Sequence, residues 1–122
     1  MKQVNLIKIF QESSIIHHGK SVILDVDLAT LINVDIHDIT VAVLGLSKDI
    51  RDDFVVPFSE NEYQELNRDF GDHRPSGLVD IAVFLILGNF KTDQAIELSV
   101  GLTTYIVDSF NERGMDVWKL LE

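Results

Sequence analysis

Apolar and polar residues near the N-terminus follow the alternation that is typical of β-strands. The segment Val4–Phe10 is rich in Val, Ile and Leu, with polar residues between them, and we expect a strand there. Two further apolar runs, Ile15-Ile16 and Val22–Leu24, flank the turn-like segment His17–Lys20. The pattern therefore predicts a strand followed by a β-hairpin.

The apolar spacing changes to three and four residues after the hairpin, which indicates helices. Leu28, Leu31 and Ile32 follow Asp25 and Asp27, whose side chains are suited to capping a helix N-terminus.

A second short helix is expected after Asp35, a further candidate cap. Its apolar stripe comprises Ile36, Ile39 and Val43, and Gly45 is expected to end or kink it.

The middle of the chain predicts a short strand and then a helix. Phe54–Phe58 is expected at the edge of a sheet, because Pro57 cannot donate a backbone hydrogen bond. Ser59 and Glu62 have the spacing of a capping box, which predicts a helix start. The residues expected on the buried side of that helix are Tyr63, Leu66 and Phe70.

The remaining third of the chain predicts a loop and two helices. Gly71–Gly77 is dense in helix breakers, Leu78–Leu87 is expected to be a mostly buried helix, and Gly88-Asn89 provides a stop. Thr92 or Asp93 is expected to cap a last helix that ends before Gly114. The apolar face expected for it comprises Ile96, Val100, Ile106, Val107 and Phe110. The tail Met115–Glu122 is expected to add a turn anchored by Trp118 and Leu121.

Size and composition limit this pattern to one domain over residues 1–122. The chain has 122 residues, 46% of them hydrophobic, which is enough apolar area for one packed core. The expected fold class is α+β, with an N-terminal β-hairpin or small antiparallel sheet packed against about four to five helices.

Charge and cysteine content exclude several classes of function. Ten basic against twenty acidic residues give a net charge of −10, which repels nucleic acid unless a basic patch attracts it. The chain has no cysteine, so disulfides and thiolate metal sites are excluded. The longest apolar run, Ile81–Leu87, is too short to span a membrane, and Met1–Phe10 does not resemble a targeting segment. We expect a cytoplasmic protein.

No arrangement of residues in the sequence specifies an enzyme. Asp25 and Asp27 end an apolar strand, as the acids of some phosphotransferases do, but Leu28-Ala29 replace the Gly-Thr of that motif. We interpret both acids as helix caps. The serines lack the Gly-x-Ser-x-Gly pattern of a nucleophile elbow, and no phosphate-binding loop is present. We expect no catalytic residue and no cofactor.

Histidines invite a metal site, but their spacing does not support one. None lies four residues from another on a helix with a neighbouring Glu, as in zinc hydrolases. We therefore expect turn and surface histidines and no metal. The four are His17, His18, His37 and His73.

The strongest charge feature is an acidic stretch between residues 52 and 72. It is interpreted either as a solvated surface or as a negative surface that docks a basic partner, such as a DNA-binding protein. The acids concerned are Asp52, Asp53, Glu60, Glu62, Glu65, Asp69 and Asp72.

The order of several motifs resembles the phage ORF-six-N domain, a relative of the KilA-N and Bro-N domains. Ile16–Ala29 is similar to the family's opening hairpin with Asp-x-Asp-Leu-Ala, and Asp52–Glu62 is similar to its Asp-Phe-x-Phe-x-Leu-Thr-x-x-Glu. Leu78–Val83 and Asp93–Leu98 resemble two later family segments. The resemblance implies an α+β fold that occurs in phage and prophage regulators, antirepressors and DNA-binding proteins.

One departure from the family changes the expected partner. The family usually carries Lys, Arg and Asn on the helix after Asp-Leu-Ala, whereas His37–Leu46 contains no Lys or Arg. Val41, Leu44 and Leu46 place apolar side chains there instead. Two alternatives stay open: a terminal segment of the chain covers them, or they form an interface with a second copy or a partner.

Two classes of function follow. The first is a non-enzymatic regulator from a phage or mobile element that binds protein, either as an antirepressor or as an inhibitor of a DNA-binding factor. The second is a DNA-binding transcriptional regulator that keeps the family's activity through its remaining bases. These bases are Lys20, Lys48, Arg51, Arg68 and Arg74. A small-molecule or enzymatic function, in a pocket between the hairpin and the last helices, is a distant third.

Overall fold

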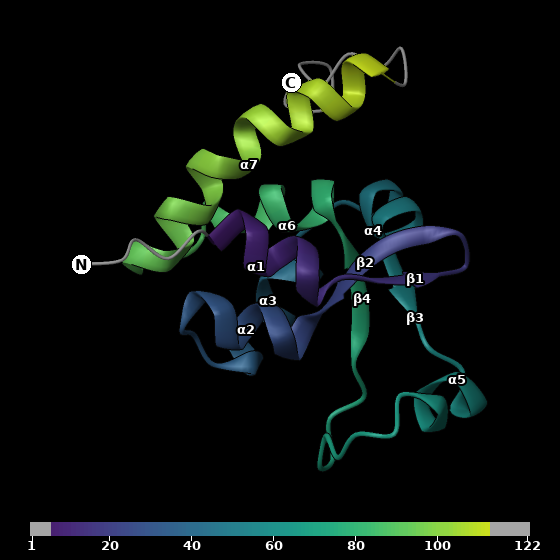
Figure 1. Cartoon of the computed structure of the whole chain (residues 1–122). Coiled ribbons are helices and arrows are strands. Elements are labelled where there is room, and N and C mark those ends of the chain that lie inside the picture. Colours follow the sequence, from purple (N-terminus) through teal and green to yellow (C-terminus); the bar gives the residue numbers. More distant parts are fainter. Residues whose placement is uncertain (1–5, 113–122) are drawn as a thin grey trace.

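A β-hairpin begins the central sheet of the computed structural model, which describes residues 6–112 (Figure 1). Strands β1 (Ile15–His17) and β2 (Lys20–Leu24) pair antiparallel, with His17 opposite Lys20. The two turn residues, His18 and Gly19, have φ values of 52° and 76°. Positive φ at both positions matches the twist of the strands, so the tight turn sets the register. The predicted hairpin is confirmed.

Two later strands complete a four-stranded sheet in the order β1-β2-β4-β3. Strand β3 (Val55–Pro57) lies at the edge, as Pro57 predicts. Strand β4 (Ser76–Val79) lies between β2 and β3, where the sequence pattern predicted a loop and the start of a helix. That prediction is wrong because the backbone groups of this short segment are paired with both neighbouring strands.

Gly77 allows β4 to approach β2 closely. A Cβ atom at this position would lie 2.7 Å from Cγ2 of Val22, which is too close for two carbon atoms. Gly77, which the sequence pattern suggests as a helix breaker, is therefore needed for close packing in the centre of the sheet.

The N-terminal segment is helix α1 (Leu6–Ser13), and the strand expected at Val4–Phe10 is wrong for its described part. Leu6 and Phe10, one helical turn apart, are both buried, and Ile7 packs against Gly101. An apolar run of this length fits either a strand or a helix, and packing against another helix decides between them.

Helices α2 (Asp25–Ile32) and α3 (Ile36–Leu44) confirm the two predicted after the hairpin. Asp35 caps α3, because its carboxylate accepts a hydrogen bond of 2.8 Å from the backbone N–H of His37. Gly45 ends α3. The prediction that Asp25 and Asp27 cap α2 is wrong: Leu24 occupies the cap position, and no side chain caps the helix there.

Two short helices flank the edge strand (Figure 1). Helix α4 (Lys48–Phe54) was not predicted, and its cap is Ser47. Helix α5 (Glu60–Glu65) begins with the predicted capping box of Ser59 and Glu62. Its expected buried stripe is wrong, because α5 ends after six residues and holds no buried residue. The side chains expected in that stripe, Tyr63, Leu66 and Phe70, are half-buried.

The last two helices, α6 (Asp80–Leu87) and α7 (Asp93–Glu112), complete the core. Gly88 ends α6, and the hydroxyl of Thr92 accepts from the backbone N–H of Ala95 at the start of α7, both as predicted. The expected face of α7 is wrong at Ile96 and Val100, which are 54% and 69% exposed. The buried face instead comprises Ala95, Leu98, Leu102 and Ile106. The expected turn at 115–122 lies outside the described residues.

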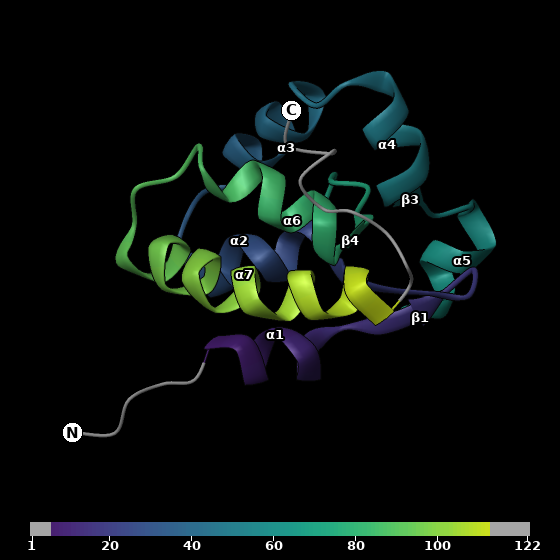
Figure 2. The same cartoon turned by 90° about the horizontal axis from the view of Figure 1, so that it is seen from above.

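The core lies where the sheet meets the long helices. Helix α7 runs beside α1 and α6 and also contacts α2 (Figure 2). The predicted α+β class is confirmed, with seven helices in residues 6–112. None of the helices in this part of the chain combines the length and apolar character needed to cross a membrane.

Candidate functional site

Helix α3 carries two exposed apolar side chains that point away from the core. The helix is anchored through Ile39, which is fully buried, and Ala42 and Val43 pack partly against the core. Val41 and Leu44 are 55% and 63% exposed. Within residues 6–112, these two large apolar side chains on one helix stay largely open to solvent.

A shallow hollow of about 680 Å³ lies beside α3, and Val41 is part of its lining. Leu46, Leu85 and Phe90 contribute apolar atoms, and the polar residues Asp38 and Asn89 also line it. Apolar surface combined with polar groups is typical of a protein-binding surface. We call Val41, Leu44 and this hollow the α3 surface.

The seven acids between residues 52 and 72 are distributed over two helices and the loop that follows them. Asp52 and Asp53 lie on α4, whereas the glutamates lie on α5 beyond the opposite end of β3 (Figure 1). Within the described residues, Asp52 pairs with Lys48, Glu60 with Arg74 and Glu62 with His18. Asp69 accepts from the backbone N–H of Gly71 in the following loop, which also holds Asp72.

The five candidate DNA-contacting bases are mostly engaged within the chain. Lys20 donates to the carbonyl oxygen of Asp53, at 2.8 Å, and Arg68 forms two hydrogen bonds to Asp27. Lys48 and Arg74 each bind a carboxylate at 2.7 Å. Arg51 is half-buried on α4. A phosphate group would have to compete with these partners, which weakens the case for DNA contact.

Asp25 and Asp27 hold the segment between α5 and β4. The Asp25 side chain is buried and lies 2.9 Å from Nε2 of His73, while Asp27 binds Arg68. Burial raises the pKa of the Asp25 carboxyl above its usual value, and the hydrogen bond to His73 opposes this shift. The two acids therefore have a structural role that local sequence pattern did not indicate, since their partners are more than 40 residues away.

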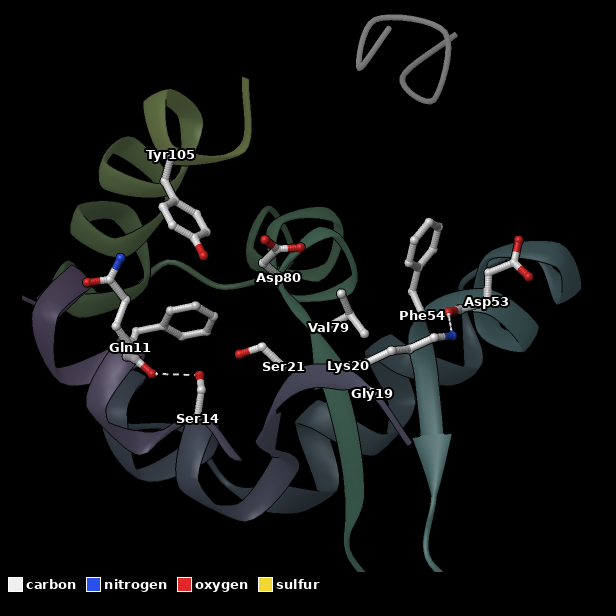
Figure 3. Close-up of a pocket in the computed structure, with 11 residues that line it drawn as sticks. Gln11, Ser14, Gly19, Lys20, Ser21, Asp53, Phe54, Val79, Asp80 and Tyr105 are labelled. Atoms are coloured by element: carbon white, nitrogen blue, oxygen red, sulfur yellow. Dashed lines mark hydrogen bonds between the residues drawn. The ribbon is translucent and has the colours of Figure 1, made fainter. Parts of the chain in front are cut away.

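A second cleft, of about 670 Å³, lies between α1, the hairpin, α4 and α7 (Figure 3). Its lining includes Tyr105 and Ser21. Ser14 donates to the carbonyl oxygen of Phe10, and Lys20 is held by the Asp53 carbonyl at another part of the lining. These two polar side chains are committed to local structure. The cleft lies between the hairpin and the last helix, where the sequence places a pocket for a small-molecule or enzymatic function.

The fold and the α3 surface together define an α+β protein with an apolar helix face that residues 6–112 leave exposed. Comparisons with protein-family models, with curated proteins and with solved structures returned no match.

Proposed function

We propose that this chain is a cytoplasmic, non-enzymatic regulatory protein that acts by binding another protein through the α3 surface. The exposure of Val41 and Leu44 beside the hollow is the observation that carries the proposal. Two apolar side chains one turn apart, with polar neighbours, give a partner both buried area and orientation. The resemblance to ORF-six-N domains supports an origin in a phage or mobile element.

The partner is expected to be basic. Helix α3 contains no Lys or Arg, its first turn carries Asp38, and the whole chain has a net charge of −10. A basic protein is steered toward such a surface, whereas an acidic one is repelled. A repressor or another DNA-binding factor has the required charge. The regulator would then act on the DNA-binding protein instead of on DNA.

Direct DNA binding is the alternative function, and the contacts of the basic side chains favour it less than protein binding. Four of the five bases available for it already bind acids or carbonyl oxygens of the chain. The free-energy cost of breaking these contacts offsets part of the free energy gained from a phosphate contact. A gel shift at low salt separates the two functions: the proposal predicts no retarded complex, and a complex with a steep salt dependence contradicts it.

Affinity capture with matched variants tests the protein-binding surface. The full-length protein, V41D/L44D and the control I96D/V100D are used as baits in lysate of the bacterial host, and retained proteins are quantified by mass spectrometry. Both double variants replace two exposed apolar side chains on a helix. The proposal predicts a basic protein that is retained by wild type and by the α7 control and is lost with V41D/L44D. If all three baits retain the same protein equally, the α3 surface is not the binding surface. If wild type retains no protein, the proposed function is contradicted.

A further inference from the structure

Two adjacent histidines and a distant glutamate meet at the end of the hairpin. Nε2 of His18 lies 2.5 Å from Oε2 of Glu62, and Nε2 of His17 lies 3.7 Å from the same oxygen. One potential ligand atom from each of the three side chains lies within 4.8 Å of the others. We call these residues the His–His–Glu cluster.

Packing fixes the position of His17 before any ligand arrives. Its side chain is 9% exposed, and its ring stacks on Phe58 at 4.0 Å and on His18 at 4.1 Å between centroids. The tight turn of the hairpin places the two imidazoles on neighbouring residues and on the same side. A rigid ring loses little freedom when it binds an ion, which favours binding.

The capping box fixes the third side chain. Oε1 of Glu62 accepts the backbone N–H of Ser59 at 2.9 Å, and its other oxygen, Oε2, faces the two histidines. The hydroxyl of Ser59 in turn accepts the backbone N–H of Glu62, so the capping box holds the glutamate in place with one oxygen directed at the histidines.

The distances around His17 are close to those of a tetrahedral metal site. Bonds of about 2.0–2.1 Å at tetrahedral angles place neighbouring ligand atoms about 3.3 Å apart. Nε2 of His17 donates a hydrogen bond of 3.2 Å to the carbonyl oxygen of Pro57 and lies 3.7 Å from Oε2 of Glu62. A metal ion on Nε2 would replace the proton of this hydrogen bond, and the proton of the imidazole would then lie on Nδ1. The His18–Glu62 pair would also have to separate, and the His18 side chain, which stacks on His17, is 57% exposed.

We propose that His17, His18 and Glu62 bind one divalent transition-metal ion of the zinc class. Two imidazoles and one carboxylate are a common ligand set for Zn²⁺, and the Pro57 carbonyl or water completes the coordination. The ion clips the hairpin to α5, a helix that has no buried residue of its own. This site is independent of the α3 surface, so either proposal can fail alone.

Calorimetric titration of the untagged full-length protein with ZnCl₂ tests the site. H18Q removes a ligand from an exposed position. E62Q removes the carboxylate charge but keeps an oxygen that can accept from the Ser59 N–H, so the capping box is retained. The control H37Q removes an exposed imidazole from α3, far along the chain from the cluster.

Wild type is expected to bind one equivalent of Zn²⁺, with H37Q unchanged. H18Q and E62Q should each weaken the affinity at least about tenfold, the lower end of what disturbing a metal site costs. Co²⁺ should give the intense visible absorption of a four-coordinate ion in wild type, and a much weaker band in H18Q. Absence of zinc binding by wild type, or equal binding by H18Q and wild type, overturns the proposal. Circular dichroism verifies that each variant is folded.

Discussion

Nε2 of His73 lies 2.9 Å from Oδ2 of Asp25, so a buried carboxylate at the start of α2 anchors the segment that leads into β4. The same carboxylate accepts the backbone N–H groups of Val26 and Ser76. One side chain therefore binds three residues, Val26 at the start of α2 and His73 and Ser76 at the entry to β4. The contact holds the loop before β4 in place against the start of α2.

Replacing Asp25 by Ala is expected to destabilise the fold by about 1–3 kcal/mol, because backbone donors near the buried carboxylate lose their acceptor. The matched control is D27A, which breaks a more exposed ion pair with Arg68 and should cost less than about 1 kcal/mol. Urea denaturation of the two variants measures both values. A larger loss in D27A than in D25A would falsify the anchoring role of Asp25.

The hydrogen bonds of Glu62 predict an acid-dependent contribution to stability. Its pKa is about 2 in the folded protein, against 4.5 as the usual value, so the folded state favours the ionised form. The contribution is fully present above pH 4.5 and is lost as the pH falls toward 2. The difference in melting temperature between wild type and E62Q, measured with EDTA present, should therefore shrink over that range.

E65Q is the control for this titration, because it removes an exposed carboxylate from the same helix. Its melting temperature should follow that of wild type between pH 2 and pH 6. A difference between wild type and E62Q that is constant over this range contradicts the role of the Ser59 and His18 hydrogen bonds.

The close approach of β4 to β2 predicts that Gly77→Ala destabilises the protein by about 1–3 kcal/mol, the usual cost of overpacking. The added carbon would meet Val22 at 2.7 Å. Gly88→Ala is the control, since no atom lies within 4 Å of its Cβ position. Thermal melts check both, and the double variant V22A/G77A should lose less stability than the sum of its single variants. Strict additivity would show that the two positions do not compete for space.

The exposure of the α3 surface predicts that V41D/L44D changes stability by less than about 0.5 kcal/mol, as is usual for surface substitutions. Size-exclusion chromatography with light scattering then separates a partner surface from a homodimer contact. Wild type and V41D/L44D should both be monomeric when no partner is present. A wild-type dimer that V41D/L44D dissociates would assign the surface to a second copy of the chain.

Elements with a local chemical signal could be predicted from the sequence. The hairpin follows from the turn at Gly19, α3 from its cap Asp35, and the start of α5 from the capping box of Ser59 and Glu62. The start of α7 follows from Thr92. In each case a few adjacent residues satisfy their own backbone groups, so distant contacts are not needed to define the structure.

Elements that depend on distant contacts could not be predicted. Leu6–Ser13 is a helix because it packs on α7, and Ser76–Val79 is a strand because it fills the gap between β2 and β3. The face predicted for α7 includes Ile96 and Val100, yet both are exposed, whereas the smaller Ala95 is buried. Periodicity alone does not show which of two apolar faces the neighbouring helices cover.

The two candidate sites differ in the same respect: one has a local signal in the sequence, and the other depends on distant contacts. Val41, Leu44 and the absence of Lys and Arg on α3 can be read from the sequence, whereas the exposure of the two side chains is seen only in the fold. His18 and Glu62, in contrast, are 44 residues apart and carry no shared motif. Only the fold, in which His17 of the hairpin contacts the carbonyl of Pro57 at the end of β3, makes them neighbours. Sequence spacing on a helix therefore could not show that these two side chains meet.

Photo-crosslinking in living host cells tests the central claim, that the α3 surface binds a basic protein, most directly. A photoreactive amino acid is placed at Leu44, and at Val100 as the matched exposed position on α7. The account predicts a crosslink to a basic, DNA-binding protein from position 44 and a much weaker one from position 100. Crosslinks that are equally strong from both positions, or that join position 44 only to DNA, would contradict it.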